Sequence, residues 1–277
     1  MKLRAPGKVN LQLSVLGRRS DGFHEIETLI LPISLADEIS VEVFAGGTVG
    51  VSCDDPDVPQ GESNLAAKAA SEFSRRTGLR FGARIAIRKR IPMGAGLGGG
   101  SSDAAAVLVA LDSIFETRLG IEPLEEIAAI LGSDVPFFVR GQPAICRGRG
   151  EIIQPFDVFE KLKLLLLKPP FAVETPWAYK AWAASRSLPG DPEDEQDLGW
   201  TRIFNALERP VFEKFLMLPV MKEWLRQQPE VRAAAMSGSG STLFAVMREG
   251  ESGRDLEERL KAEFGETLWT VLCEAPL

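Results

Sequence analysis

The sequence predicts a two-domain α+β fold, and three features of the chain predict it. In the first half, short apolar runs with strand spacing alternate with two strong helical segments. The second half places helices between strands without the regular strand–helix alternation of a parallel sheet. The unbroken apolar centre of KLKLLLLK (161–168) is typical of a buried strand that opens the second half. We therefore predict an N-terminal domain over residues 1–155 and a C-terminal domain over residues 156–277.

The first half is predicted to contain strands and helices in a mixed order. Leu11, Leu13 and Val15 alternate with polar or small residues, which is the period of a half-buried strand. In chain order the predicted segments are strands at 11–15 and 39–43, a helix over 63–76 capped by Ser63 or Asn64, a strand over 83–91, a helix that carries the apolar run 104–111, a helix from about Pro123 to Leu131, and two edge-like strands between 142 and 153.

The second half is predicted to lay helices on a small antiparallel or mixed sheet. After the strand at 161–168 comes an acidic segment rich in proline and glycine, Leu188–Trp200, which predicts a solvated loop. The remaining predicted segments are an amphipathic helix over 210–227, the segment AAAMSGSGSTLFAVM (233–247), a charged helix over 253–263 and a last strand over 268–275.

The segment Pro92–Ala106, PMGAGLGGGSSDAAA, predicts an anion site. Five of the seven residues in Gly94–Gly100, which we call the glycine loop, are glycine. Such density of glycine costs backbone entropy on folding. It is therefore expected where the backbone must approach something closely. The residues Ser101–Asp103 are good N-caps, and the apolar run 104–111 behind them predicts a helix. Because the start of a helix presents unpaired N–H groups and a positive dipole end, phosphate is the expected occupant.

The glycine spacing alone fits more than one nucleotide site. Gly94, Gly96 and Gly99 match G-x-G-x-x-G, the fingerprint of dinucleotide-binding folds. Against that interpretation, the second half lacks strand–helix alternation, and no acidic residue follows a strand about 20 positions later. A P-loop is excluded because no lysine follows the glycines. A purely structural glycine-rich turn remains as the other interpretation.

The bulk composition limits the partners and the chemistry. The net charge of −7 argues against binding to nucleic acid or to an anionic membrane, and no apolar run has the length of about 18 residues that spans a bilayer. Lys8 and Asn10 interrupt the N-terminal apolar run, so it does not resemble a signal peptide. Three widely spaced cysteines indicate reduced thiols in a cytoplasmic protein. The oligomeric state expected is a monomer or a homodimer, and the sequence does not decide between them. With His24 as the one histidine, acid–base work falls to carboxylates and lysines.

Three segments together resemble the GHMP kinases, which include galactose, homoserine and mevalonate kinases. They are APGKVNLQLSV (5–15), the glycine-rich segment 92–106 and SGSGSTLFAV (237–246), and they occur in the order of that family's motifs. The resemblance implies transfer of the ATP γ-phosphoryl group to an alcohol. It also implies a left-handed βαβ unit in the N-terminal part, a hand that physical rules would not predict, and a ferredoxin-like C-terminal part.

Three further segments narrow the resemblance to one branch of the family. They are RRSDGFHEIETL (18–29), LGSDVPFF (131–138) and CRGRGE (146–151). This branch phosphorylates the 2-hydroxyl of a CDP-linked methylerythritol, a small-molecule substrate of the non-mevalonate route to isoprenoid precursors. A GHMP kinase with a mevalonate-type or homoserine acceptor, and a nucleotide-binding protein without catalysis, are the alternatives.

By the resemblance, Asp134 is the general base and Lys8 the electrostatic stabiliser. The apolar neighbours of Asp134, from Val135 to Phe138, would raise its pKa by desolvation. Asn10 lies two residues after Lys8, hence on the same strand face, and would bind the acceptor alcohol. The plainer interpretations are that Asp134 caps a turn before Pro136 and that Lys8 is a solvated surface charge.

The resemblance assigns ATP binding to the glycine-rich segment and to two residues upstream of it. Lys89 lies on the strand that enters the glycine loop, and Asn64 lies at the first helix cap, where it is equally well read as a plain cap. Mg²⁺ is expected with ATP, but no carboxylate cluster identifies its protein ligands. The expected loop contacts are Pro92, Met93, Gly94, Gly96, Leu97, Gly98, Gly99, Gly100, Ser101 and Ser102.

The resemblance places cytidine against Phe23 and His24. The ring at position 23 would stack on cytosine, and His24 would bind its polar edge. Many family members carry tyrosine where this chain has Phe23, so the stacking face is kept and a hydroxyl is lost. Tyr179, the one tyrosine of the chain, would supply a second stacking ring. A half-buried structural histidine and a core tyrosine are the alternatives.

Overall fold

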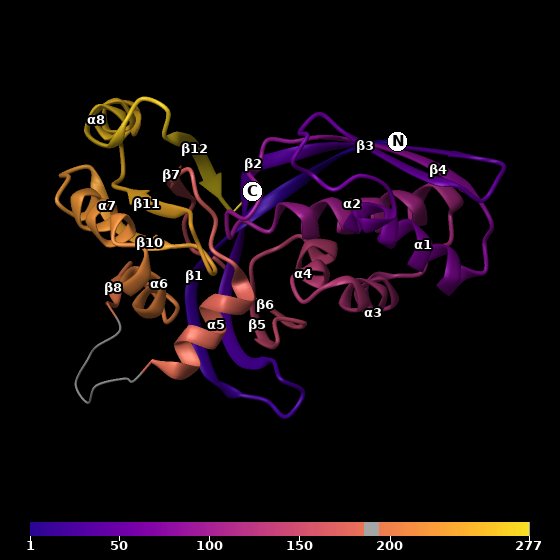
Figure 1. The fold of residues 1–277 in the computed structure, drawn as a ribbon, viewed down its shortest axis with the longest axis horizontal. Helices are drawn as coiled ribbons and strands as arrows, with labels where there is room; N and C mark the ends of the chain where they lie inside the picture. Colours follow the sequence, from indigo (N-terminus) through magenta and orange to yellow (C-terminus); the bar gives the residue numbers. More distant parts are fainter. Residues whose placement is uncertain (186–193, 277) are drawn as a thin grey trace.

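The fold is built on one long antiparallel hairpin. The computed structural model describes residues 1–185 and 194–276. Strand β1 (Lys2–Arg18) pairs with β2 (His24–Phe44) from the Arg18–His24 end to the Lys2–Ser40 end. Both strands extend far beyond the runs that alternation predicts, because their central residues are buried on both faces and therefore show no alternation. Figure 1 shows the hairpin running from the first half of the molecule to a tip beside α5.

The hairpin lies inside the first sheet, whose main strand order is β3-β4-β2-β1-β9-β8. Strand β5 pairs with both β2 and β6, so it is enclosed where an edge-like position was expected. Parallel β3 and β4, joined through α1, form a βαβ unit; its predicted left hand stays a prediction. The remaining bounds are β3 (Val49–Cys53), β4 (Gly82–Arg88), β5 (Ala144–Gly148), β6 (Ile152–Pro155), β8 (Gln196–Asp197) and β9 (Arg202–Asn205).

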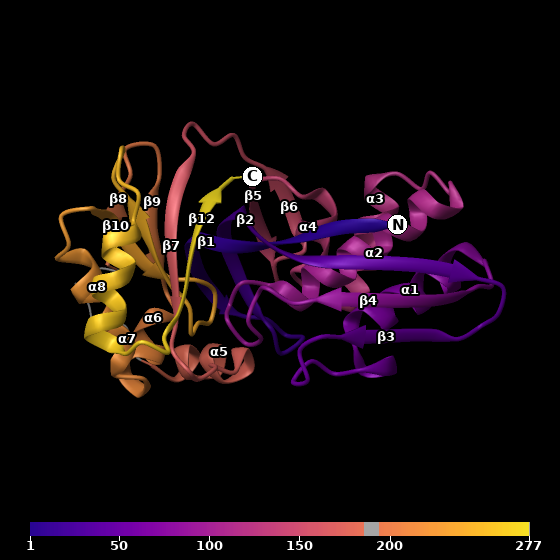
Figure 2. The same cartoon turned by 90° about the horizontal axis from the view of Figure 1, so that it is seen from above.

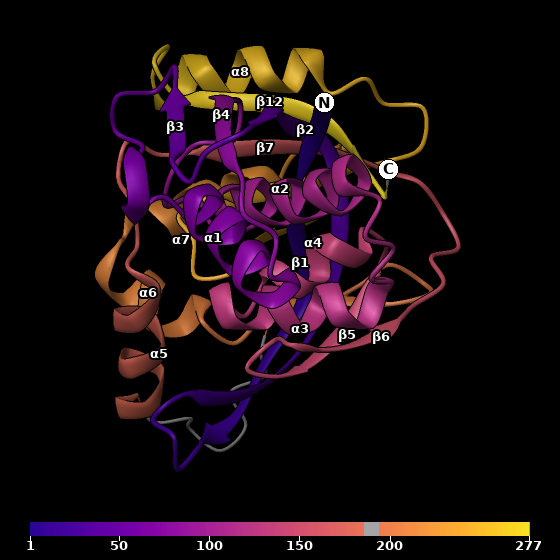
Figure 3. The same ribbon diagram turned by 90° about the vertical axis from the view of Figure 1, so that its right-hand side faces the viewer.

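Helices cover one face of this sheet (Figure 3). Small alanine side chains on α1 (Leu65–Thr77) and α2 (Gly99–Phe115) are buried in the core, which lets the two helices approach closely. Helix α2 begins earlier than the predicted cap at Ser101–Asp103, because Gly98 adopts a left-handed φ of 72° and ends the loop there. The other elements on this side are the short 3₁₀ helix Gly61–Ser63, α3 (Ile121–Leu131) and α4 (Val135–Arg140).

The second sheet has the order β10-β11-β7-β12 and is antiparallel throughout. With its helices it follows the strand–helix–strand–strand–helix–strand pattern of a ferredoxin-like fold, as predicted. Strands β8 and β9 come from the same half of the chain yet join the first sheet. The boundary between residues 155 and 156 stays a prediction. The bounds are β7 (Leu162–Lys168), α5 (Thr175–Ala184), β10 (Val231–Met236), β11 (Leu243–Met247), α8 (Arg254–Phe264) and β12 (Trp269–Ala275).

The predicted helix over 210–227 is two helices, α6 (Glu208–Lys214) and α7 (Met217–Arg226). The break falls at Phe215, whose backbone is not helical and whose ring stacks on Phe171 at 5.1 Å between centroids. Residues 188–193 of the predicted loop lie outside the described residues. The rest of the predicted loop, 194–200, contains β8.

Strand β7 is buried on both faces, which explains its unbroken run of leucines. Leu165 and Leu167 pack on the side of α7 and α8, while Leu164 and Leu166 pack against residues of β1 and β2. Figure 2 shows the second sheet enclosed between these layers. No helix in the described part of the chain is long and apolar enough to cross a membrane.

We expect Leu165→Ala to lower the free energy of unfolding by about 2–5 kcal/mol, because it leaves a cavity in a close-packed interior. Leu165 is 0% exposed. Urea denaturation measures the loss. Leu216→Ala is the matched control: Leu216 is 69% exposed, and its truncation should change stability by no more than about 0.5 kcal/mol. Equal losses for the two variants would contradict this packing.

Candidate functional site

A cavity of about 1010 Å³ is lined by residues from both halves of the chain. Its walls come from β1, β2, the glycine loop, the start of α4, α5 and the turn after β10. It brings together most of the residues singled out in the sequence. These are Lys8, Asn10, Phe23, His24, Asn64, Lys89, Pro92, Met93, Gly94, Gly96, Gly98, Gly99, Gly100, Ser101, Asp134 and Tyr179.

The glycine loop forms the start of α2 as a site for an anion. The first intrahelical bond runs from the Ser102 N–H to the Gly98 carbonyl at 2.9 Å. The N–H groups of residues 99–101 therefore have no partner within the helix, and these residues line the cavity beside the positive end of its dipole. Gly98 could not carry a side chain, since a Cβ there would lie 2.7 Å from the Phe138 ring.

Two expected loop contacts do not line the cavity. Leu97 is fully buried in the core, and its carbonyl accepts a hydrogen bond from the Lys8 backbone N–H at 3.0 Å. Ser102 is buried inside the first turn of α2, and its hydroxyl has no hydrogen-bond partner. Both residues are therefore part of the protein interior beneath the glycine loop and do not face the cavity.

Lys8 is a buried cation in the middle of β1, not a solvated surface charge. Its side chain is 4% exposed and donates to Oδ1 of Asn10. Asn10 in turn donates to the Thr28 hydroxyl at 2.8 Å, and Thr28 donates to the Gln12 carbonyl at 2.5 Å. Burial lowers the pKa of Lys8, and the charge of Asp134 offsets part of that effect. Asn10 therefore positions Lys8, in addition to its predicted contact with the acceptor.

Asp134 presents a carboxylate to the cavity. It precedes α4, but its side chain makes no capping bond, so the alternative capping role is not realised. Val135, Phe137 and Phe138 turn into the core and do not enclose the carboxylate, which is half-buried. Within the described residues no hydrogen bond or ion pair engages it, which leaves its oxygens free to accept a proton or a hydrogen bond.

Electrostatic and packing contacts connect the two ends of the cavity. Lys8 contacts the glycine loop, since a Cβ on Gly98 would lie 3.3 Å from its side chain. Asp134 acts on the charge of Lys8 and also on Tyr179, whose pKa is raised by burial and, to a lesser extent, by Asp134. Tyr179 stacks on His24. The glycine loop, Lys8, Asp134 and the aromatic rings thus line one cavity.

The aromatic end differs in detail from the expected stack. The rings of His24 and Tyr179 lie 5.3 Å apart at 25°, and Trp182 meets His24 edge-on at 6.1 Å. Among the residues that the structure describes, none gives Nε2 of His24, a buried atom, a hydrogen-bond partner. Burial together with Arg18 lowers the pKa of His24. Phe23 is half exposed, with the Arg149 guanidinium 4.8 Å from its ring centroid. Cytosine stacking by Phe23 and Tyr179 stays a prediction.

Lys89 lies one residue beyond β4 and is held by two buried carboxylates. Its ammonium donates to Asp37 and, at 2.9 Å, to Asp103. Asp37 also accepts the backbone N–H groups of Arg90 and Ile91, so it pins the chain where it enters the loop. Burial, with the second carboxylate, raises the pKa of Asp103. Lys89 reaches the cavity from this ion-pair cluster, and its contact with the nucleotide stays a prediction.

Asn64 acts as the N-cap of α1. Its Oδ1 accepts the Ala66 N–H at 2.8 Å, and its Nδ2 donates to the Pro59 carbonyl at 2.7 Å. The capping interpretation is therefore confirmed, while its contact with the nucleotide stays a prediction.

Several residues of the site were not singled out from the sequence. Gly238 and Ser239 line the cavity from a motif that the sequence identified only as a resemblance, and Arg149 lines it from the CRGRGE segment. Their signals were the glycine–serine repeat and the clustered arginines. Asp37 and Thr28 carried no local signal, because their partners are distant in the sequence.

Comparison with known proteins identifies the family. Residues 64–142 match the family described as GHMP kinases N terminal domain, and residues 194–266 match GHMP kinases C terminal. A 4-diphosphocytidyl-2-C-methyl-D-erythritol kinase of Methylacidiphilum infernorum is 44% identical over 277 residues, covering 98% of this chain and 95% of that relative.

Solved structures agree. A crystal structure of 4-(cytidine 5'-diphospho)-2C-methyl-D-erythritol kinase superposes with a TM-score of 0.78 at 38% identity and covers 99% of both chains. A homoserine kinase from Cytophaga hutchinsonii shares the fold, with a TM-score of 0.72 at 17% identity, covering 99% of this chain and 94% of that one. The chain is a kinase that belongs to the GHMP kinases and, within them, to the 4-diphosphocytidyl-2-C-methyl-D-erythritol kinase family.

Proposed function

We propose that this chain transfers the γ-phosphoryl group of ATP to the 2-hydroxyl of 4-diphosphocytidyl-2-C-methyl-D-erythritol, giving the 2-phosphate and ADP. One observation carries the proposal. A single cavity joins a helix-start anion site to a histidine–tyrosine stack, with a buried lysine and an unpaired carboxylate linking the two. The names of the similar proteins support the choice of acceptor.

In this proposal Asp134 accepts the proton of the 2-hydroxyl. The alcohol oxygen then forms a bond to the γ-phosphorus as the bond to the β–γ bridging oxygen breaks, and ADP leaves. A carboxylate that lacks an ion-pair partner keeps its oxygens available for that proton. Support comes from the absence of a hydrogen bond or ion pair at Asp134 within the described ranges 1–185 and 194–276, and from its place in the cavity wall.

Lys8 supplies positive charge where negative charge develops. Its ammonium is fixed by Asn10 before substrate arrives, so little reorganisation accompanies the reaction. The glycine loop would hold the ATP phosphates through the N–H groups at the start of α2. Such fixed donors are worth more in a dehydrated cavity than in water.

Mg²⁺ would enter with ATP. This ion keeps several waters and binds mainly phosphate oxygens, so it requires few protein ligands. The described residues contain no group of three side chains from His, Cys, Asp and Glu that could hold an ion alone. We therefore expect an ion that is held mainly by the phosphate oxygens of the nucleotide. When bound, Mg²⁺ would neutralise charge on the phosphates.

The aromatic end would bind the cytidine group. Within the described residues Nε2 of His24 is a buried polar atom without a hydrogen-bond partner, and a ligand hydrogen bond would satisfy it. Aromatic faces at Phe23 and Tyr179 offer stacking area for a pyrimidine. Homoserine and mevalonate carry no ring that could stack on these aromatic faces.

Asp134→Asn should lower kcat by about 10²–10⁴-fold, the usual contribution of a general base. The rate should fall because the amide cannot take the proton. Because the amide keeps the size of the side chain, nucleotide affinity should hardly change. ATP consumption with the CDP-linked acceptor measures the rate, and calorimetric titration with ADP measures the affinity. Asp255→Asn, at an exposed position of α8, is the control. Equal rates in wild type and Asp134→Asn would remove the base assignment.

The pH dependence of kcat should carry an alkaline limb set by Lys8. Because burial lowers the pKa of Lys8 from 10.5, its ammonium deprotonates at a lower pH than a free lysine. The rate should therefore fall as pH rises, with a midpoint below 10.5. Lys8→Met should lower kcat by about 10²–10³-fold, like removal of an oxyanion donor, and its residual rate should lack that limb. A limb that persists in Lys8→Met would assign it to another group.

We expect the aromatic end of the cavity to determine which acceptor is phosphorylated. Wild type should consume ATP with the CDP-linked acceptor and not with mevalonate or homoserine. His24→Ala should raise the KM for the CDP-linked acceptor by about 10-fold, the value of one buried hydrogen bond, and leave the KM for ATP unchanged. Initial rates at varied acceptor and varied ATP separate the two constants. Turnover of mevalonate or homoserine in preference would overturn the acceptor assignment.

A further inference from the structure

The turn Ser237–Ser241, which we call the glycine turn, is held against the catalytic residues. The Ser237 hydroxyl donates to the Gly96 carbonyl at 3.1 Å, and the Asn10 N–H reaches that hydroxyl at 3.4 Å. A Cβ on Gly238 would lie 3.1 Å from Nζ of Lys8. The glycine turn therefore closes directly over Lys8 and the glycine loop, and its position limits where the Lys8 ammonium can lie.

Asn205 grips this turn from the other side. Its Nδ2 donates to the carbonyl of Met236 at 2.7 Å and to that of Gly238 at 2.8 Å. Its Oδ1 accepts the Leu207 N–H at 2.9 Å, so the carboxamide cannot rotate without breaking a third bond. Asn205 is 5% exposed and does not line the cavity.

The chain fixes Asn205 relative to β1. Strand β9 pairs in parallel with β1, with Asn205 opposite Leu13, and the Ala206 N–H donates to the Leu13 carbonyl at 2.8 Å. Lys8 and Asn10 lie on the same strand β1. Asn205 therefore fixes the position of the glycine turn relative to the strand that carries Lys8.

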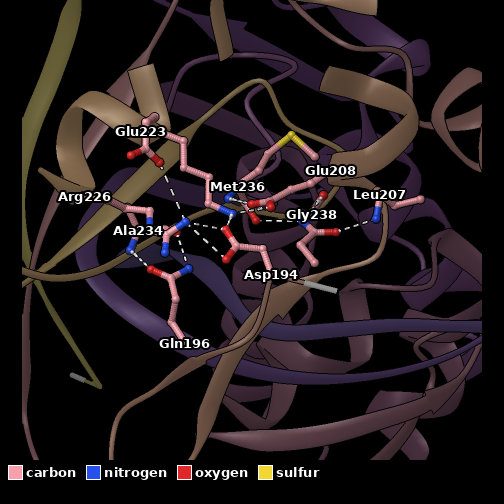
Figure 4. Close-up of polar contacts among 11 residues, drawn as sticks. Asp194, Gln196, Leu207, Glu208, Glu223, Arg226, Ala234, Met236 and Gly238 are labelled. Carbon is pink, nitrogen blue, oxygen red and sulfur yellow. Dashed lines mark hydrogen bonds and ion pairs between the residues drawn. The ribbon is translucent and has the colours of Figure 1, made fainter. Parts of the chain in front are cut away.

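A buried ion-pair network supports the same place. Glu208 accepts the Met236 N–H at 2.7 Å and pairs with Lys222, which also contacts Asp194 at 2.9 Å. Figure 4 shows Glu208 beside Met236 and Gly238, with Asp194 nearby. Side chains therefore hold both backbone polar groups of Met236, with Glu208 on its N–H and Asn205 on its carbonyl. The end of β10 is rigid where the glycine turn begins.

We propose that Asn205 is a positioning residue for the phosphoryl-transfer site, acting through the glycine turn on Lys8. The kinetic part of this inference rests on the proposed function. Without the carboxamide, the Gly238 carbonyl loses its donor, while the bond from Ser237 to Gly96 and the bond from Thr242, just after the turn, to Ala95 remain. The turn would stay attached but would sample positions away from Lys8.

Gln196, on β8, offers a matched control because it also holds strand β10. Its carboxamide also holds the main chain of β10 by two bonds, accepting from the Ala234 N–H at 2.9 Å and donating to the Ala234 carbonyl at 2.8 Å. Ala234 lies in the middle of the strand, away from the glycine turn. A purely structural role predicts the same behaviour for Asn205→Ala and Gln196→Ala.

We expect Asn205→Ala to lower kcat by about 10²-fold, since a displacement of about 1 Å at reacting groups has that effect. The KM values should stay within a few-fold. Gln196→Ala should keep the wild-type kcat, and both variants should lose about 2–4 °C in Tm. Asn205→Asp keeps the shape and the Leu207 contact but turns an oxygen toward two carbonyls, so it should not rescue kcat. A kcat of Asn205→Ala within twofold of that of Gln196→Ala would overturn the inference.

A second measurement does not depend on the acceptor. Pulse labelling with an amine-reactive reagent, read by peptide mass spectrometry, reports the exposure of Lys8 in the full chain. Labelling of Lys8 should rise several-fold in Asn205→Ala and stay at the wild-type rate in Gln196→Ala. If wild type does not turn over the CDP-linked acceptor while this difference holds, the proposed function fails and the positioning role stands. Equal labelling in the two variants would overturn the positioning role.

Discussion

The burial of the Lys8 ammonium is the constraint on which the rest of the site depends. An ammonium taken out of water costs several kcal/mol unless polar groups surround it. Asn10 supplies an oxygen, Thr28 fixes the orientation of Asn10, and the charge of Asp134 acts through space. These partners come from β1, β2 and the start of α4, so the site exists only when those elements are in register. The curved hairpin of β1 and β2 is what keeps them there.

Two glycine segments far apart in the sequence share one purpose. A Cβ on Gly96 would collide with the carbonyl oxygen of Ser237, and a Cβ on Gly238 would lie 3.1 Å from the Gly96 carbonyl. The glycine loop and the glycine turn are therefore glycine-rich partly because each leaves room for the backbone of the other. The proposed phosphate binding would use the N–H groups at the start of α2, and mutual packing explains why side chains are missing on the opposite side.

Local patterns predicted most elements but few of the long-range contacts. The leucine run at 161–168 and the apolar run at 104–111 predicted buried elements, and the resemblance supplied the residues proposed for the site. The start of α2 was misplaced because Ser101–Asp103 are good caps, whereas a left-handed Gly98 decides the boundary. The pairing of Lys89 with Asp37, the enclosure of β5 and the addition of β9 to the first sheet are tertiary choices, and no local spacing encodes them.

The charge of the cavity resolves an apparent conflict between an acidic chain and anionic ligands. The whole chain carries −7, which on its own would repel nucleotides. The cavity wall instead holds five cationic side chains against three carboxylates: Lys8, Arg18, Lys89, Arg149 and Lys180 against Asp21, Asp103 and Asp134. A concave site with an excess of one sign of charge attracts oppositely charged ligands locally. Asp21 pairs with Arg19 and Asp103 pairs with Lys89, so within the described residues Asp134 is the carboxylate of this wall that has no ion-pair partner.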